Sequence, residues 1–380
     1  MRLCRICKTE TTSVVDLGDF YLSTFVDRPG DHIGKCPLHL VRCPKCTLVQ
    51  LEDTAPQELL YARKYWYRSG INDVIREDLK DIVRETLGLV ALDEGDIFLD
   101  IGANDGTLLS FVPVGQKIGV EPARNLQEEL GKVAMVIDDF WENVDLGKKA
   151  KIITAIGMFY DSEDPNLFIG NVKKHLHENG IFISQLMTLL PMLRTNDLGN
   201  ICHEHLEYYT YQSLKYLFES NGLEIYHVEE NGINGGSYRL FARHFKNGSI
   251  NWIESEPDFE SFVLRITENK FSVVDFIQRK VEEGKKIYGF AASTKGNTIL
   301  QWYGLTSDLI AGIGDRNPEK IGKLTVGTHI PIISEEEARM NADYFLVLPW
   351  GFLDSFMDRE KEWRSRGGKF LTHTPKFSII

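Results

Sequence analysis

This chain lacks long apolar runs. None of its stretches approaches the ~18 consecutive apolar residues of a membrane-spanning helix. Its first residues, Met1 to Cys4, also lack the apolar core of a signal peptide. We therefore expect a cytoplasmic protein that is not associated with a membrane.

Basic charge is also scarce. The chain carries 43 Lys and Arg against 55 Asp and Glu, which gives a formal net charge of −12. Non-specific binding to nucleic acid needs basic surface, so this balance argues against a nucleic-acid partner. Low-complexity segments and convincing internal repeats are missing too. With 380 residues, 43% of them hydrophobic, the chain is long enough for about two or three packed domains.

Cysteine is rare, but four of the six cysteines form two C-x-x-C pairs, Cys4 with Cys7 and Cys43 with Cys46. In a reducing compartment, such pairs indicate metal binding more often than disulfides. Four thiolates suit tetrahedral Zn²⁺, and a site closed by four thiolates has no open position for chemistry. We therefore expect structural zinc, with an inserted hairpin or loop near residues 18–34.

A glycine-spaced turn follows the apolar run that ends at Asp100. The turn contains Gly102, Asn104 and Gly106, and a helical stretch begins at Thr107. A strand, a tight turn and a helix in this order are typical of a nucleotide-cofactor site. The spacing D-x-G-x-N-x-G is not the dinucleotide motif, and an acid at the strand end favours a cation. The turn therefore predicts a site for a ligand such as S-adenosylmethionine, with its amino group near Asp100.

A second acid supports the cofactor hypothesis. Glu121 ends the next apolar run, at residues 117–120, where a carboxylate can bind ribose hydroxyls. Asp139 and Phe140 complete the predicted cofactor contacts. The alternative is a solvent-exposed β-α turn that binds nothing.

The apolar pattern divides the chain into three blocks. Residues 1–75 form the zinc module and its exit, residues 76–283 hold the cofactor loop, and residues 284–380 form a second, smaller α/β unit. The alternation of strands and helices in the second block is typical of a parallel, doubly wound sheet with an antiparallel end. The strands predicted for this block are 97–101, 117–120, 134–137, 151–156, 180–185, 223–228 and 237–243. Those predicted for the third block are 287–290, 309–315, 344–348 and 369–372. Helices are predicted over 71–87, 166–177, 206–221, 257–284 (one or two), 298–303 and 354–366.

The run from His203 to His205 has the most reactive composition. Two histidines flank Glu204 after the fifth predicted strand, at the sheet edge where ligands gather. A histidine titrates near neutral pH and can accept a proton. Histidines at i and i+2 do not share a helix face, so a zinc protease is not indicated. From these residues alone, catalysis and a structural cluster satisfied by backbone groups both stay open.

Two further regions carry polar groups. Tyr65, Tyr67 and Arg68 lie in a Tyr-Trp-Tyr-Arg-Ser-Gly run that either anchors the zinc module or lines a sugar or phosphate pocket. In the third block, several polar residues follow predicted strands or lie in turns. Where such a turn opens a helix, the backbone amides at the helix start attract anions. These residues suggest a pocket for a phosphorylated ligand, with ordinary β-α turns as the alternative; they are Ser293, Lys295, Asn297, Asp315, Asn317 and His329.

In this order, the motifs resemble the sugar C-methyltransferases that act on nucleotide-linked 4-keto deoxysugars. The likeness covers nearly the whole chain. Its carriers are Cys4-x-x-Cys7 with Asp16-Leu17-Gly18, Cys43-Pro44-x-Cys46 with Leu48-Val49-Gln50-Leu51, and the segments 65–70, 100–106, 203–205, 235–237, 295–297 and 327–331.

The resemblance implies a three-part α/β enzyme. It comprises a small zinc module, a Rossmann-like class I methyltransferase core that binds S-adenosylmethionine, and a C-terminal Rossmann-like domain that holds the nucleotide diphosphate of the sugar. The base of the family maps onto His205, with Glu204 beside it, and a pocket tyrosine maps onto Tyr65. Tyr65 or His203 would donate a hydrogen bond to the enolate. In one departure, Cys202 stands where the family has a tyrosine thought to contact the sugar.

The resemblance predicts methylation of a carbon next to the ketone, with C3 as the expected position. An O- or N-methyltransferase acting on a nucleotide-activated sugar is the nearest alternative, because it keeps the fold and the cofactor. A non-catalytic zinc module that binds nucleic acid or a protein is the third. We expect a monomer or a small homo-oligomer.

Overall fold

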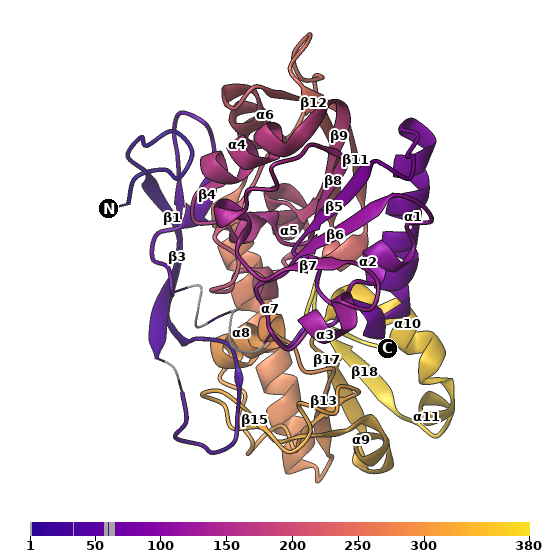
Figure 1. Cartoon of the computed structure of the whole chain (residues 1–380). Coiled ribbons are helices and arrows are strands. Elements are labelled where there is room, and N and C mark those ends of the chain that lie inside the picture. The colour runs from indigo at the N-terminus through magenta and orange to yellow at the C-terminus, as the bar shows by residue number, and fades with distance from the viewer. Residues whose placement is uncertain (1, 33, 57–59, 61–64) are drawn as a thin grey trace.

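The computed structural model describes residues 2–32, 34–56, 60 and 65–380. Most strands lie in three sheets, which are joined by helices (Figure 1). Within the described ranges, no helix is both long enough and apolar enough to cross a membrane.

The N-terminal sheet has the strand order β1-β3-β4-β10 and is antiparallel in the pairs that form it. β1 and β3 form a hairpin between the two cysteine pairs, which confirms the expected insertion. A separate short strand, β2, pairs with β15 near the C-terminal sheet. The bounds are β1 (Thr12–Tyr21), β2 (Phe25–Val26), β3 (Lys35–Arg42), β4 (Val49–Leu51), β10 (Glu207–Tyr208) and β15 (Leu324–Thr325).

The central sheet has seven strands in the order β11-β12-β9-β8-β5-β6-β7. The strands from β7 to β9 in this row are parallel, and β12 is antiparallel to both of its neighbours. Each strand predicted for this block is confirmed, as is the antiparallel end. The bounds are β5 (Ile97–Ile101), β6 (Gln116–Val120), β7 (Met135–Ile137), β8 (Ala150–Ile156), β9 (Leu176–Met187), β11 (Leu223–Asn231) and β12 (Ser237–His244).

Helices cover both faces of the central sheet. Phe98 and Leu99 are neighbours on β5 and point to opposite faces, as strand geometry requires. Phe98 packs in one core cluster with Leu79 of α1, and Leu99 packs in another with Phe168 of α4 and Leu214 of α6. The helices of this part are α1 (Asp73–Leu89), α2 (Thr107–Ser110), α3 (Gln127–Leu130), α4 (Pro165–His175), α5 (Leu189–Thr195) and α6 (Tyr211–Ser220).

The helix predicted over residues 206–221 is wrong at its start. Thr210 and Ser213 form a capping box, in which each side chain accepts a hydrogen bond from the backbone N–H of the other. The helix therefore begins at Tyr211. The preceding Glu207 and Tyr208 form β10, which pairs with β4 of the zinc module. Similarly, α1 begins two residues later than predicted because Asn72 caps it.

The C-terminal sheet has six strands in the order β16-β14-β13-β17-β18-β19. Its pairs are parallel except for the antiparallel pair of β18 with β19. A single long helix, α7 (Phe259–Glu282), joins this sheet to the central part (Figure 1). The other bounds are β13 (Ile287–Phe290), α8 (Thr294–Tyr303), β14 (Ile313–Asp315), β16 (Ile332–Ser334), α9 (Glu335–Asn341), β17 (Tyr344–Val347), α10 (Leu353–Arg359), α11 (Lys361–Ser365), β18 (Lys369–Thr372) and β19 (Ser378–Ile379).

Three predictions for this block need correction. α8 begins at Thr294 rather than at residue 298, because the Ser293 hydroxyl caps the helix by accepting a hydrogen bond from Gly296 N–H at 2.9 Å. β14 is shorter than the predicted strand 309–315. The helix predicted over 354–366 is two helices that meet at Glu360, whose buried carboxylate pairs with Arg339.

The zinc module packs against the C-terminal part of the chain as well as the central sheet. Leu40 of β3 lies in one core cluster with Ile266 of α7, Ile299 of α8 and Leu346 of β17. This shared core joins the N-terminal and C-terminal sheets, while Cys4, Cys43 and Leu48 of the zinc module lie in a second cluster with residues of the central sheet.

Candidate active site

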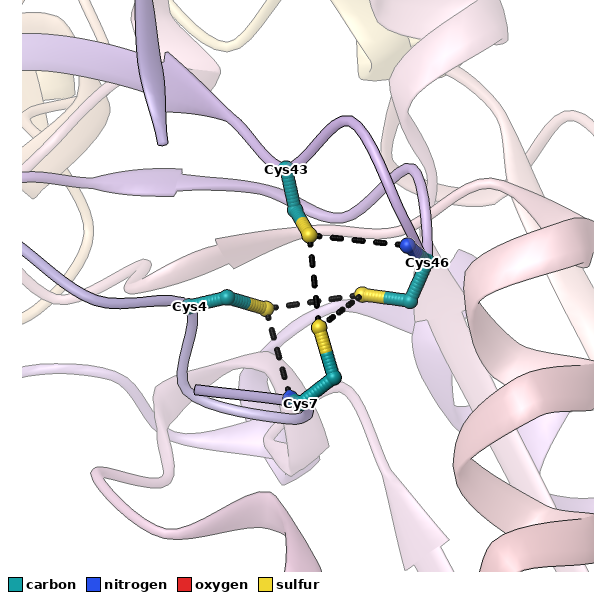
Figure 2. A group of neighbouring side chains, drawn as sticks. All are labelled: Cys4, Cys7, Cys43 and Cys46. Atoms are coloured by element: carbon teal, nitrogen blue, oxygen red, sulfur yellow. Dashed lines mark hydrogen bonds between the residues drawn. The ribbon is translucent and has the colours of Figure 1, made fainter. Parts of the chain in front are cut away.

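The four predicted zinc ligands meet at one point. The Sγ atoms of Cys4, Cys7, Cys43 and Cys46 lie within 4.8 Å of one another. The closest pairs, Cys4 with Cys46 and Cys7 with Cys43, are each 3.4 Å apart (Figure 2). Sulfurs at ~2.3 Å from a tetrahedral Zn²⁺ would be about 3.8 Å apart, so the cluster fits the metal with only a small expansion.

Backbone geometry supports the same conclusion. The N–H groups of Cys7 and Cys46 each approach the sulfur of the first cysteine in their pair at 3.5 Å. Donors around a thiolate stabilise its negative charge and orient the ligand. Lys8 and Thr47 follow the pairs in left-handed backbone conformations, which close each turn around the sulfurs. The site is structural, because all four positions of a tetrahedral ion would be taken by protein.

A cavity of about 270 Å³ lies between the central and C-terminal sheets. In the central sheet the chain order reverses between β5 and β8, and in the C-terminal sheet it reverses between β13 and β17. Ligands of open α/β sheets bind at the carboxyl ends of strands at such reversals. The residues that follow all four of these strands line the same cavity. Two ligand-binding edges therefore open on one space.

The cofactor edge presents most of the predicted cofactor residues. Gly102, Asn104, Glu121 and Phe140 line the cavity. Gly102 has φ 67°, and a Cβ there would lie 2.7 Å from Met158 Cγ, so the turn requires glycine.

Glu121 holds the cofactor loop in place. Its carboxylate accepts hydrogen bonds from the N–H groups of Asn104 and Ala123, each at 2.8 Å. Burial raises its pKa to about 7. Each carboxylate oxygen has a second lone pair, so the group keeps capacity for ribose hydroxyls.

The other predicted cofactor residues lie outside the cavity lining. Asp100 is buried behind the turn and accepts a hydrogen bond from Thr154 Oγ1 at 2.6 Å. Burial, with a smaller contribution from the charge of Glu121, raises the pKa of Asp100 to about 7. Gly106 packs against Val133, and Asp139 accepts from its neighbour Phe140 N–H at 2.7 Å.

The structure places some of the predicted catalytic residues in the cavity lining and one outside it. Tyr65, Glu204 and His205 line the cavity. His203 does not line it; its Nε2 donates a hydrogen bond to the Cys36 carbonyl at 2.9 Å. The His203–His205 segment lies in a turn between α5 and β10.

His205 is oriented as a base would need to be. Its Nδ1 donates to the Asn200 carbonyl at 2.9 Å, which leaves the lone pair on Nε2. The ring meets the Tyr160 ring edge-on, with centroids 4.6 Å apart. Burial, assisted by the charge of Lys295, lowers the pKa of His205 to about 3, so the imidazole is neutral at physiological pH.

Glu204 interacts with residues of the C-terminal part of the chain. Burial raises the pKa of its carboxyl to about 7, against the opposing effects of a hydrogen bond from Thr294 and the charge of Lys295. Thr294 and Lys295 come from the C-terminal part of the chain. The His203–His205 segment therefore lies where the central and C-terminal parts meet.

Some of the predicted substrate residues line the cavity, and the others lie outside its lining. Tyr67, Ser293 and Lys295 line the cavity. Arg68 instead pairs with Glu319 at 2.6 Å, and Asn297 donates to the Thr24 carbonyl at 3.0 Å.

The remaining three lie away from the cavity lining. Asp315 accepts hydrogen bonds from Ala292 and Asn317 N–H, each at 2.7 Å, and organises the turn after β14. His329 is exposed in a left-handed conformation.

Several cavity residues were not predicted. The segment from Leu348 to Phe352, which follows β17, lines the C-terminal side. The sequence contains a signal for this segment, because the turn residues Pro-Trp-Gly directly follow the predicted strand 344–348. Asp78, Tyr160 and Asp197 also line the cavity, but they come from three separate elements and share no local pattern.

Three family models match the chain in succession. They describe a zinc binding domain at residues 4–61, a methyltransferase domain at residues 72–228 and a C-methyltransferase C-terminal domain at residues 232–375. Together with the sheet order and the cofactor edge, they define an S-adenosylmethionine-dependent methyltransferase with a class I core and a structural zinc site.

More specifically, the match of its third part is to a C-methyltransferase domain, and over its full length the chain is similar to a C-methyltransferase. C-methyltransferase NovU from Streptomyces niveus is 27% identical over 407 residues, which cover 99% of this chain and 96% of that protein.

Two solved structures overlap the chain in part. An S-adenosylmethionine-dependent methyltransferase from Clostridium acetobutylicum is 13% identical and covers 45% of this chain and 93% of its own, with a TM-score of 0.37. Magnesium protoporphyrin IX methyltransferase from Synechocystis PCC 6803, with bound S-adenosylmethionine, is 10% identical and covers 46% and 82%, with a TM-score of 0.37.

Proposed function

We propose that this methyltransferase methylates a nucleotide-linked 4-keto deoxysugar at C3, the carbon next to the ketone. The observation that carries the proposal is the shared cavity, in which the cofactor edge and the C-terminal edge face each other across Glu204 and His205. A site that must bring a methyl donor and a separate small acceptor together needs this arrangement.

His205 is the proposed base. A ketone acidifies the neighbouring C–H, and an imidazole with a free Nε2 lone pair can remove that proton. The proton passes to Nε2, and the C–H electron pair forms an enolate. The bound methyl donor would supply an electrophilic methyl group to the enolate carbon, with cleavage of its carbon–sulfur bond and return of the ketone. The Nδ1 bond to Asn200 keeps the ring oriented throughout.

The acceptor would bind to the C-terminal edge. Tyr67, Ser293 and the Leu348–Phe352 segment provide aromatic and polar groups around the cavity. The family resemblance assigns the nucleotide part to this domain. We also propose the boundaries 1–75, 76–283 and 284–380 for the three domains.

The test is a product analysis with purified, zinc-loaded protein. We expect transfer of a labelled methyl group from S-adenosylmethionine to a 4-keto nucleotide sugar and none to the matched 4-hydroxy sugar. Mass spectrometry gives the added mass, and NMR shows whether the new methyl carbon is bonded to carbon. Methylation of the 4-hydroxy sugar on oxygen or nitrogen would replace this proposal with the O- or N-methyltransferase alternative.

A further inference from the structure

Lys295 lies at the second position of α8, yet its side chain reaches the methyltransferase domain. Its Nζ is 2.8 Å from Met187 Sδ at the end of β9 and 3.8 Å from Asp197 Oδ2. The side chain is 22% exposed and lines the cavity. The ammonium therefore lies at the wall where donor and acceptor would meet, rather than on the outer surface of the C-terminal domain.

The charge of the ammonium also acts on the proposed base. Its charge is one of the causes that shift the pKa values of both Glu204 and His205, in each case downward. Such charge effects weaken with distance. Lys295 comes from the C-terminal domain and Glu204 and His205 from the methyltransferase domain, and all three line the cavity.

The contacts of this ammonium leave N–H donors available for a ligand. A lysine has three N–H donors, and a thioether sulfur is a weak acceptor. Among the described residues, the contacts found for Lys295 Nζ are that sulfur and one carboxylate beyond hydrogen-bond distance. A cation held beside the cavity in this way can donate to an oxygen of the acceptor.

The proposed reaction has a need for such a group. A buried imidazole of lowered pKa is neutral but weakly basic, so it cannot supply all the driving force for C–H removal. The remaining stabilisation has to come at the oxygen, where negative charge develops.

We propose that Lys295 is a catalytic residue that donates a hydrogen bond to the enolate oxygen of the acceptor. This inference rests on the proposed C-methyltransferase function. The C–H bond breaks, His205 receives the proton, and the electron pair moves through the carbonyl carbon to the oxygen beside the ammonium. Lys295 keeps its proton, and it releases the oxygen when the ketone re-forms during methyl transfer.

The test separates proton removal from methyl transfer. The protein is incubated in D₂O with a 4-keto nucleotide sugar and S-adenosylhomocysteine, which has no methyl group to donate, and deuterium entry at C3 is followed by NMR. We expect wild-type protein to exchange the proton and Lys295→Met to lose at least about 100-fold in rate. Lys295→Arg should retain part of the rate, because a guanidinium keeps the charge and donates without releasing a proton.

Controls distinguish this role from binding of the diphosphate. Lys361→Met is the matched surface change, since its side chain is 73% exposed. Calorimetry with a nucleoside diphosphate should give equal affinities for wild type and Lys295→Met. Should the methionine variant fail to fold, Lys295→Gln takes its place.

Two outcomes would overturn the inference while leaving the proposed function in place. One is exchange by Lys295→Met at the wild-type rate. The other is a weakened affinity for the nucleoside diphosphate with normal exchange at saturating sugar, which would make Lys295 a phosphate-binding residue. Absence of exchange in the wild-type protein, together with methylation of a 4-hydroxy sugar, would instead overturn the proposed function and this inference with it.

Discussion

The central and C-terminal sheets share a doubly wound topology, but their edges present different groups to the cavity. β5 of the central sheet leads into a turn with left-handed residues at Gly102 and Asn104, beside the buried Glu121. β13 of the C-terminal sheet is joined to α8 by residues 291–293, of which Ala291 is also left-handed, and α8 brings the ammonium of Lys295 rather than a carboxylate to the cavity. None of the described C-terminal residues that line the cavity is acidic.

This difference indicates how the two ligands are kept apart. The central edge combines a tight backbone turn with a carboxylate, which suits a cationic donor that carries a ribose. The C-terminal edge combines an ammonium with aromatic and hydroxyl groups, which suits an acceptor whose carbonyl oxygen becomes negatively charged during the reaction. The predictions below test whether the two edges act independently.

The largest effect is expected for His205→Asn, which removes the proposed base between the edges. Methyl transfer should fall by about 100- to 10,000-fold. Affinity for S-adenosylmethionine, measured by calorimetry, should be unchanged because the residue lies outside the cofactor turn. Full activity would remove His205 from the role of base, and lost cofactor binding would contradict the separation of the edges.

Next is Glu121→Gln at the cofactor edge. Hydrogen bonds to a charged group contribute about 1.5–3 kcal/mol, so the Kd for S-adenosylhomocysteine should rise about 10- to 100-fold. The affinity for a nucleoside diphosphate should not change. Glu128→Gln, an exposed change seven residues away, is the matched control. Equal losses for both ligands would show that the edges are coupled.

A smaller effect is expected from pH. Burial raises the pKa of Glu121 to about 7. If the predicted ribose contact forms, the hydroxyls would donate to the ionised carboxylate. Binding therefore favours loss of the proton, so affinity for S-adenosylhomocysteine should increase as pH rises from 6 to 8. The increase is at most about tenfold per pH unit for one proton. Calorimetry of Glu121→Gln should show a weaker dependence, and an unchanged slope would assign the proton to another group.

The smallest effect is expected for Trp350→Leu at the C-terminal edge. An aromatic ring contributes about 0.5–1.5 kcal/mol beyond its buried area, so KM for the nucleotide sugar should rise about two- to tenfold. The cofactor Kd should stay constant. An effect on cofactor binding alone would place this residue with the other edge.

The sequence predicted best those features that depend on neighbouring residues. The zinc ligands, the strands of the central sheet and the turn at Gly102 each have a short-range pattern, and the structure contains them. The strand predicted over 369–372 is β18 without change. The functional roles of the individual site residues stay predictions.

Features that depend on distant partners were missed. Glu207 and Tyr208 look helical locally but form a strand because β4, which is more than 150 residues earlier, pairs with them. Asp197 reaches the cavity only because α8 and the loop after α5 meet there. The hydrophobic pattern within each segment does not predict these long-range contacts, because they depend on tertiary packing.

The pairing of β4 with β10 connects the metal module to the segment that carries the proposed base. Leu51 N–H donates to the Leu206 carbonyl at 2.9 Å, immediately after His205. A truncated enzyme that began at α1 would keep every residue of the cofactor turn and would still lose the strand that pairs next to the proposed base. Attempts to shorten this catalyst, or to exchange its first domain for that of a relative, therefore have to transplant β4 and its histidine turn as a matched pair.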